Sequence, residues 1–262
     1  MMHSRTSATL VAVAFALTLG GCAAKSSIVP AGTAEADEFL FQRGEAELKE
    51  RHWAAAREYY RQIVDNYPQS PHRPDAKLAV GDTYIGEDTA ESLVLAANEF
   101  REFLTFYPTN ARADYAQYRL AYAYSQQMLA PDRDQSATRD VIKELLVFLD
   151  RYPNSALLPD ARKLLREAKD RLSEASYRVG LHYYRVKWWP GAVDRFREIL
   201  QLDPEYTRRD AVYFHLAEIL VRTDKKAEAL PYYERLLSEF EQSEYLEDTR
   251  RRVAELKPPS AI

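Results

Sequence analysis

The chain has 262 residues, of which 46% are hydrophobic and 29% are charged, and its formal net charge is −4 at pH 7. Without a basic excess, binding to the phosphates of a nucleic acid is not expected. Only eight glycines occur in the whole chain, which argues against an all-β fold rich in tight turns and favours a helical body with a sizeable core.

The first 21 residues have the features of a secretory signal peptide. Arg5 is the only charged residue before an uncharged stretch from Thr6 to Gly21, and residues 8–19 at its centre are apolar. This stretch is shorter than the roughly 20 apolar residues that a membrane-spanning helix needs, so a permanent transmembrane anchor is the weaker interpretation. We therefore expect residues 1–21 to be removed from an exported protein.

Cys22 is the only cysteine of the chain and directly follows this segment. A single cysteine cannot form an internal disulfide, and a single soft ligand makes a poor metal site. The stretch Leu19-Gly20-Gly21-Cys22 resembles the lipobox of bacterial lipoproteins, which implies cleavage before Cys22 and acylation of its thiol and amine. The other interpretation is that Cys22 is incidental and that signal peptidase cuts nearby.

A lipid on Cys22 would also decide where the protein resides, because more than one acyl chain gives stable membrane anchoring. Ala23 follows the cysteine, whereas enterobacterial lipoproteins that stay in the inner membrane typically have Asp there. The resemblance therefore favours the periplasmic face of the outer membrane. Residues 22–36 would comprise the acylated cysteine and a flexible tether, since they are small and polar without helical periodicity.

A glycine, an alanine, an aromatic residue and a proline recur at one fixed spacing along the chain. The first set is Gly44, Ala56, Tyr60 and Pro68, and the second is Gly180, Ala192, Phe196 and Pro204. This spacing predicts a hairpin of two antiparallel helices, whose axes approach to about 8 Å where the small residues face each other. We expect each glycine to contact the alanine, the aromatic ring to fill the space beside them, and the proline to end the second helix.

Other sets follow the same pattern less closely. Ala217, Ala229 and Tyr233 keep the spacing, but Glu241 stands in place of the proline, and the third set contains an insertion at 126–138. The sequence predicts an all-α superhelical solenoid of five tetratricopeptide repeat (TPR) hairpins over residues 37–257, with a tail at 258–262. The repeats are expected at 37–70, 74–110, 114–155, 173–206 and 210–243, with a connecting helix at 157–171.

Several features occur together in this chain: the signal peptide with its lipobox, the five repeats, the YPNS stretch at 152–155, the stretch 179–196, and the insertion with Asp132, Arg133, Asp134 and Arg139. Together they resemble the BamD family, lipoproteins of the β-barrel assembly machinery in the Gram-negative outer membrane. The resemblance implies a non-enzymatic scaffold that binds the periplasmic domains of the barrel subunit BamA. It also implies accessory assembly lipoproteins as partners, and a role in recognising and inserting unfolded outer-membrane proteins. Trp188-Trp189-Pro190 has no counterpart that we can assign to the family.

Arg195 ends an A-x-x-R motif that begins at Ala192. The resemblance implies that this arginine contacts BamA, where its guanidinium would form a bidentate pair with a carboxylate that lysine could not reproduce. Without the resemblance, Arg195 would be interpreted as an ordinary solvated charge.

A substrate groove is predicted from the geometry of the repeats, because the first helix of each hairpin would line the concave face. Counting from the small residues assigns these side chains to it: Phe41, Leu48, Leu78, Ile85, Tyr118, Tyr122, Tyr177, Tyr184 and Phe214. An extended segment with aromatic side chains, as in outer-membrane β-strands, could bind in such a groove. The alternative is that these residues only fill space between helices.

The charged insertion admits two interpretations, a solvated loop or a local ion-pair device in which Arg133 and Arg139 meet the aspartates at 132, 134 and 140. A calcium loop is excluded because Ala137 stands where the turn needs glycine and Lys143 where the bidentate glutamate belongs. We favour a structural brace at the third-repeat end of the groove.

No recognisable catalytic motif, metal-ligand motif or phosphate-binding glycine loop occurs in the sequence. We therefore expect no enzymatic activity and no cofactor besides the lipid. Two other binding functions remain open: a pilotin that brings a secretin to the outer membrane, and a periplasmic coordinator of cell-envelope constriction. The coordinator usually carries a coiled coil before its repeats, and residues 23–36 have no heptad pattern.

Overall fold

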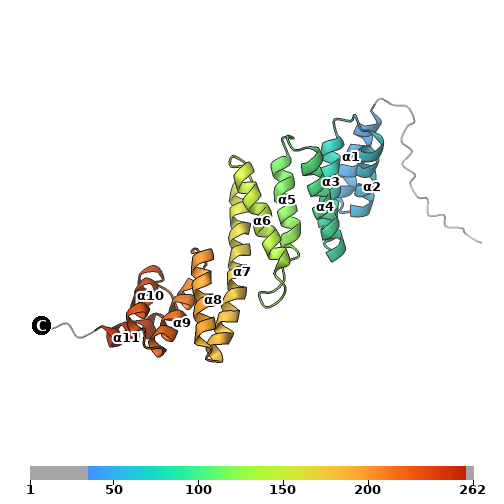
Figure 1. Cartoon of the computed structure of the whole chain (residues 1–262). Helices are drawn as coiled ribbons and strands as arrows, with labels where there is room; N and C mark the ends of the chain where they lie inside the picture. Colours follow the sequence, from blue (N-terminus) through green and yellow to red (C-terminus); the bar gives the residue numbers. More distant parts are fainter. Residues whose placement is uncertain (1–34, 258–262) are drawn as a thin grey trace, which may run out of the picture. The chain divides into compact units, whose positions relative to one another are not determined.

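The computed structural model describes residues 35–257, and every regular element in this range is an α-helix (Figure 1). The helices are α1 (Ala36–Lys49), α2 (Trp53–Asn66), α3 (Arg73–Glu87), α4 (Ala90–Phe106), α5 (Ala113–Ser125), α6 (Ser136–Arg151), α7 (Leu158–Arg185), α8 (Trp189–Leu202), α9 (Arg209–Arg222), α10 (Lys226–Glu239) and α11 (Leu246–Leu256). The predicted signal peptide, Cys22 and the tail at 258–262 lie outside the described residues.

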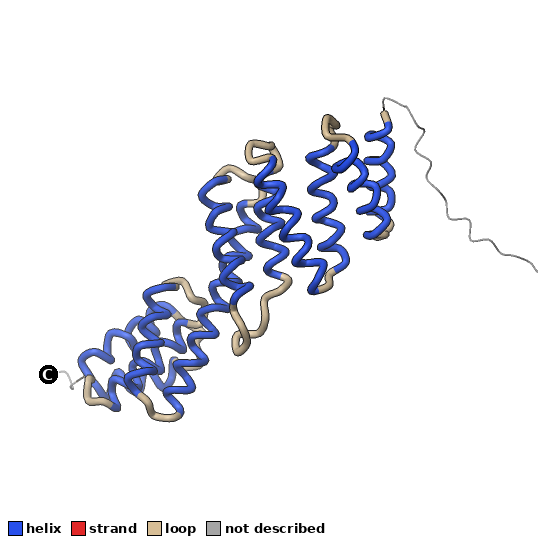
Figure 2. Tube along the Cα trace, turned by 45° about the vertical axis from the view of Figure 1, so that its right-hand side comes forward, coloured by secondary structure: helices blue, strands red, loops and turns tan. Residues whose placement is uncertain are grey.

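Successive helices pack against each other in chain order from α2 to α11, as the tube in Figure 2 shows. The hairpins are α1–α2, α3–α4, α5–α6, the second half of α7 with α8, and α9–α10. Helix α11 packs on α10 after the last hairpin. Each hairpin is therefore buried mainly by its neighbours, as in tetratricopeptide repeats.

Helix α7 differs from the expected arrangement, because the connecting helix predicted at 157–171 and the first helix of the fourth repeat are one continuous helix of 28 residues. Pro159 lies at its start, where a missing N–H is tolerated. Neither glycine nor proline occurs between residues 160 and 179, so nothing in the sequence interrupts the helix. One rigid element thus joins the third hairpin to the fourth.

The predicted close helix contacts occur at the glycines, but the nearest neighbour is the aromatic ring and not the alanine. A Cβ atom added at Gly44 would lie 2.6 Å from the Tyr60 ring, and one added at Gly180 would lie 2.6 Å from the Phe196 ring. The alanine at 192 is fully buried in the same interface. The glycine is needed because the ring lies directly over its backbone.

Serine-containing turns close the hairpins and explain why the proline expected at position 241 is dispensable. The hydroxyls of Ser155 and Ser243 donate to Asp114 and Asp210, at 2.5 and 2.6 Å, and each aspartate lies in the first turn of the same hairpin. Each hydroxyl also accepts the backbone N–H two residues further on. Helix α10 therefore ends at Glu239 without a proline.

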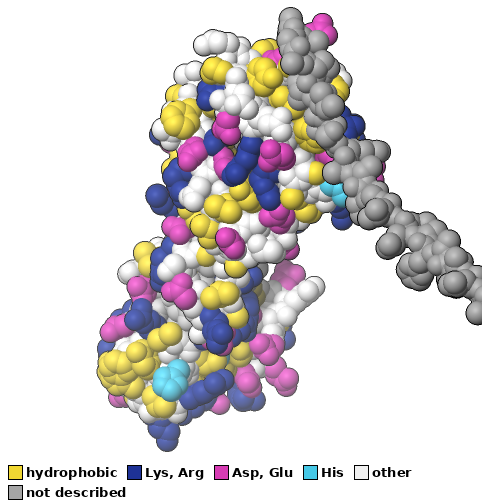
Figure 3. All heavy atoms as spheres, turned by 90° about the vertical axis from the view of Figure 1, so that its right-hand side faces the viewer, with side chains coloured by type: hydrophobic (Ala, Val, Ile, Leu, Met, Phe, Trp, Pro, Cys, Tyr) yellow, Lys and Arg dark blue, Asp and Glu magenta, His cyan; other side chains and the backbone are white. Residues whose placement is uncertain are grey.

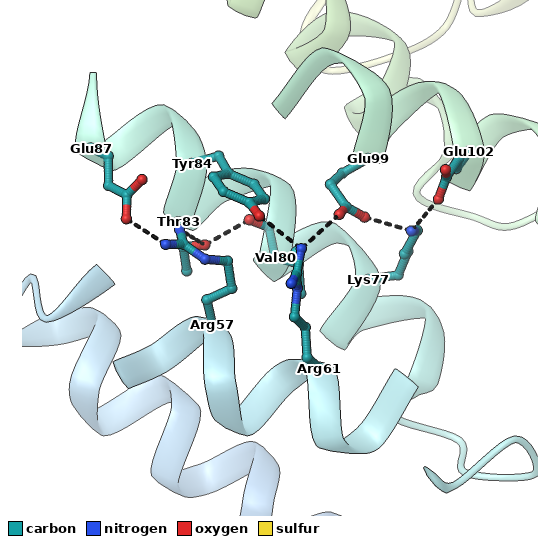
Figure 4. A network of polar contacts seen from close by, with 9 residues as sticks. All are labelled: Arg57, Arg61, Lys77, Val80, Thr83, Tyr84, Glu87, Glu99 and Glu102. Carbon is teal, nitrogen blue, oxygen red and sulfur yellow. Dashed lines mark hydrogen bonds and ion pairs between the residues drawn. The ribbon is translucent and has the colours of Figure 1, made fainter. Parts of the chain in front are cut away.

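A polar network fixes α2 against the next hairpin (Figure 4). Arg57 pairs with Glu87 at 2.5 Å, and Arg61 donates to the Tyr84 hydroxyl at 2.7 Å. The ammonium of Lys77 lies 2.5 Å from Glu99 and 2.6 Å from Glu102. Burial lowers the pKa of Lys77, but the two carboxylates outweigh it and raise the pKa, so the cation is retained.

Candidate docking and client-binding site

Two hollows lie along the second half of α7, on different sides of the helix. We name the first the insertion hollow, because its wall includes the charged insertion; its volume is about 690 Å³. It is lined, among others, by Asp132, Arg133, Arg139, Val179, His182, Tyr183 and Arg195. The second, of about 640 Å³, we name the aromatic hollow, and it is lined by Glu174, Tyr177, Arg178, Leu181, Tyr184, Arg185, Arg208, His215 and Tyr245.

The helical period explains the two sides. Residues 179, 182 and 183 lie on one face of α7 and residues 177, 181 and 184 on another, whereas Arg178 borders both hollows. Because α7 is continuous from Leu158 to Arg185, one rigid helix positions both surfaces. Side chains on a rigid element hold their relative geometry better than side chains on loops.

The insertion is braced by α7 and not by ion pairs within itself. Arg171 donates to the Leu129 carbonyl at 2.8 Å, and the Arg178 guanidinium lies 3.8 Å from the Asp132 carboxylate. Gln135 is buried and donates to the carbonyls of Ala130 and Arg133. These contacts give the loop a defined shape beside the hollow.

The ion-pair device that the sequence suggested for the insertion does not form among residues 35–257. The carboxylate of Asp134 accepts the N–H of Ser136 at 2.9 Å, and this backbone bond, with the Ser136 hydroxyl, lowers the pKa of Asp134. Arg133 and Arg139 have no carboxylate within 4 Å in that part of the chain, and both line the insertion hollow. Asp134 instead accepts hydrogen bonds from the backbone N–H and the hydroxyl of Ser136, the first residue of α6.

Arg195 of α8 lines the same hollow, so the structure brings it together with the insertion residues Asp132, Arg133 and Arg139. Its guanidinium donates to Glu198 of the same helix at 2.8 Å, and both side chains are exposed. An exposed pair three residues apart contributes little to stability. Arg195 is therefore accessible to a partner.

The aromatic hollow collects side chains from three separate parts of the chain. The Tyr184 ring lies edge-on to the His215 imidazole, with 5.0 Å between the ring centroids, and Tyr245 lies 5.6 Å from the same imidazole. Phe214 stacks on Tyr245 at 4.6 Å. Arg208 pairs with Glu174 at 3.0 Å on the rim.

Titration in the aromatic hollow follows from burial. Burial lowers the pKa of His215, against the opposing effect of the Ala211 carbonyl that its ring contacts at 2.7 Å. Burial also raises the pKa of Tyr177. Both rings are therefore neutral near pH 7, and the positive charges of the hollow come from its arginines.

The other predicted groove residues form separate local groups. Phe41 contacts Tyr60 and His72 at 5.6 and 5.0 Å, and Tyr118 contacts Tyr122 at 6.4 Å. Leu48 and Ile85 are half-buried. Among the described residues, no aromatic contact joins these groups to Tyr177 and Tyr184.

Two of the predicted groove residues lie largely within the core. Leu78 is 1% exposed and Tyr177 is 3% exposed, so Leu78 offers no surface to a peptide and Tyr177 offers only the edge that borders the aromatic hollow. Sequence reasoning also omitted His215 and Tyr245. His215 directly follows the predicted groove residue Phe214, and this neighbourhood could have indicated it. Tyr245 follows the last predicted repeat, and no pattern in the sequence indicated that it would line a hollow.

Residues 35–257 contain no cluster of three or more side chains suited to hold a metal ion, and no helix there is both long and apolar enough to cross a membrane. The face displayed in Figure 3 interleaves acidic and basic side chains, with hydrophobic side chains gathered beside a histidine in its lower part.

Comparison with known proteins relates this arrangement to a family. The model of the YfiO family, described as an outer membrane lipoprotein, matches residues 33–226, and a tetratricopeptide repeat model matches residues 211–243. The prediction of an all-α tetratricopeptide fold is therefore confirmed.

Similar proteins share modest sequence identity with the chain. It is 27% identical over 231 residues to the outer membrane protein assembly factor BamD of Caulobacter vibrioides, covering 87% of this chain and 74% of that protein. It is 24% identical over 178 residues to BamD of Xylella fastidiosa strain 9a5c, covering 64% of this chain and 60% of the relative. Among solved structures, the TPR2AB domain of yeast Sti1 in a pHSP90 complex is 14% identical with a TM-score of 0.45, covering 86% of this chain and 99% of that one.

Proposed function

This chain belongs to the YfiO/BamD family of outer membrane lipoproteins, and we propose that it is a non-enzymatic scaffold of outer-membrane protein assembly that binds a BamA-like barrel subunit and unfolded client proteins. The observation that carries the proposal is the placement of Arg195 and the insertion around one hollow on α7. The insertion is the most specific part of the family resemblance, Arg195 is the residue for which the resemblance implies a BamA contact, and the two are far apart in the sequence.

The insertion hollow supports the docking half of the proposal through its charge. Arg133, Arg139 and Arg195 all line it, and Asp132, which pairs with Arg178, is the acidic side chain among its lining residues. A periplasmic domain with an acidic surface would complement this wall, which favours fast and oriented association. The guanidinium of Arg195 is suited to a bidentate bond with a carboxylate of that domain.

The aromatic hollow supports the client half. Its tyrosine and histidine rings provide apolar faces and edges, and Arg185 and Arg208 provide cations on the same wall. An unfolded outer-membrane protein presents extended segments with aromatic side chains, which gain affinity by placing a ring in such a cavity. The two surfaces lie on different sides of α7, so the scaffold can hold partner and client together.

Anchoring to the periplasmic face of the outer membrane through a lipid on Cys22 belongs to the same proposal. Cys22 lies outside the described residues, so the lipid anchor is supported by the lipobox resemblance and by the family match alone. Incorporation of labelled palmitate into the wild type and its loss in Cys22→Ala tests the anchor.

The docking half is tested with Arg195→Glu in the full-length lipoprotein. Outer membranes are solubilised in mild detergent, the tagged chain is purified, and the co-purified barrel subunit is quantified. We expect the charge reversal to reduce recovery at least tenfold, because a carboxylate would face the acidic surface of the partner.

Arg197→Glu is the matched control, since Arg197 lies on the same helix but pairs with Glu228 of α10 at 3.0 Å. Equal recovery of the barrel subunit with both variants would remove Arg195 from the interface. Recovery of a secretin in place of a barrel subunit from the wild type would instead support the pilotin function.

A further inference from the structure

The turn between α7 and α8 presents an exposed indole beside the insertion hollow. Trp189 packs inward, with its ring 5.6 Å from the Tyr184 ring. Trp188 points outward and is 53% exposed. Such exposure is unusual for tryptophan, which is on average largely buried in folded proteins. The two neighbouring tryptophans therefore have different roles.

Trp188 is held in one orientation although it is exposed. Its ring lies edge-on to Tyr183, with 4.5 Å between the ring centroids. A Cβ atom added at Gly191 would lie 2.5 Å from the indole, so the ring packs directly on the glycine backbone. Lys187, with φ of 61°, sets the tight turn before it. A side chain ordered in advance loses little conformational entropy when it binds.

Further exposed apolar side chains continue the surface on both helices. Val179 lies on α7 and Val186 directly follows its last residue, whereas Leu202 is the last residue of α8, seven positions after Arg195. Val179, Val186 and Leu202 are all exposed. Tyr183 links the parts, because it lines the insertion hollow and also contacts Trp188.

We propose that Trp188 is the apolar anchor of the surface that docks onto the barrel partner's acidic periplasmic domain, and that it fills a pocket on that domain beside the carboxylate that Arg195 binds. This inference rests on the proposed function and names a residue that the family resemblance does not provide. A rigid, central aromatic side chain next to charged groups is the usual composition of an interface hot spot. Tyr183 contacts Trp188 and also lines the insertion hollow, so the indole and the basic wall form one continuous surface. We therefore assign the same acidic partner to both.

The test measures the affinity of the full-length, detergent-solubilised chain for the purified periplasmic domains of the barrel partner. Trp188→Ala is expected to raise the dissociation constant at least tenfold. The dissociation constant of Trp188→Phe is expected to lie between those of the wild type and Trp188→Ala, because a ring is retained. Phe106→Ala is the matched control, since Phe106 is an aromatic residue that is 69% exposed at the end of α4. The affinity of this variant for the periplasmic domains should equal that of the wild type. Thermal unfolding of each variant checks that the fold persists.

The outcomes separate this inference from the proposed function. If Arg195→Glu weakens binding and Trp188→Ala does not, the docking surface stands and the anchor is overturned. If the wild type itself does not bind the periplasmic domains, the proposed function and the anchor both fail. If Trp188→Ala reduces binding to phosphatidylethanolamine and phosphatidylglycerol vesicles but leaves the partner affinity unchanged, the indole contacts lipid and the inference is wrong.

Discussion

Single glycines determine how closely the helices of a hairpin approach. At Gly180 the ring of Phe196 occupies the place of a side chain, and at Gly81 the ring of Phe100 does the same. The spacing in the sequence predicted a packing role for Gly180. It could not predict that the ring, and not the alanine, is the nearest neighbour, because ring orientation depends on the crossing of the two helices.

We expect Gly180→Ala to destabilise the protein by about 1–2 kcal/mol in thermal or urea unfolding. Alanine gains up to about 1 kcal/mol in helix propensity, but its Cβ would lie 2.6 Å from the Phe196 ring, and overpacking of this kind costs about 1–3 kcal/mol. In a Phe196→Leu background the smaller side chain makes room, so the added cost of Gly180→Ala should shrink. The same cost in both backgrounds would refute the contact.

Asp203 should make stability depend on pH. It is 6% exposed and lies at the end of α8, where it accepts hydrogen bonds from Arg166 and from Ser173. Burial raises the pKa of Asp203, but the bonds from Arg166 and Ser173 outweigh it, so the pKa is lowered. Its contribution is fully present above the unfolded pKa of about 4 and is lost as the pH falls through the lower folded pKa.

We therefore expect Asp203→Asn to lower the free energy of unfolding by about 2–3 kcal/mol at pH 7, and the difference from the wild type to narrow below about pH 4. Glu205→Gln is the control, because the Glu205 carboxylate is exposed and makes only a long contact of 3.7 Å with Arg166. This substitution should change the free energy of unfolding little at any pH. A difference that stays constant from pH 7 to pH 3 would show that the Asp203 carboxylate is not the titrating group.

At the scale of elements, the insertion and α7 act together. The sequence indicated a brace but assigned it to pairs inside the insertion, because local pairs are all that spacing can suggest. Its partners Arg171 and Arg178 lie on α7, more than forty positions later in the chain, where the spacing of charges within the insertion gives no hint of them. The continuous α7 was missed for a related reason, since the repeat pattern predicted a boundary that no glycine or proline provides.

We expect Arg171→Ala to increase hydrogen exchange in residues 127–135 severalfold without changing the melting temperature by more than a few degrees. The guanidinium of Arg171 holds the Leu129 carbonyl at 2.8 Å, and a loop without this bond opens more often. Arg162→Ala, at an exposed position of the same helix, is the control and should leave exchange unchanged. Equal exchange in both variants would mean that the loop does not depend on Arg171.

For the whole molecule, α7 is the element that borders both hollows, and in the proposed function it therefore relates docking to client binding. The fold class and the packing role of the repeat glycines were accessible from the sequence, because they depend on periodic spacing, whereas the role of Arg195 stays a prediction from a family motif. The aromatic hollow was only partly accessible, since it combines Tyr184, His215 and Tyr245 from three helices or turns. Helical counting gives the face on which a residue lies, but not whether a neighbouring repeat buries it, as it buries Leu78.

The central claim, two surfaces on two sides of one helix, is tested most directly by site-specific photocrosslinking in living cells. A photoreactive phenylalanine replaces His182 in the insertion hollow in one strain and Arg185 in the aromatic hollow in another. Position 182 should crosslink the periplasmic part of the barrel subunit, and position 185, which lines only the aromatic hollow, should crosslink newly exported outer-membrane proteins. Capture of the same partner from both positions, or of neither class from either, would contradict the account.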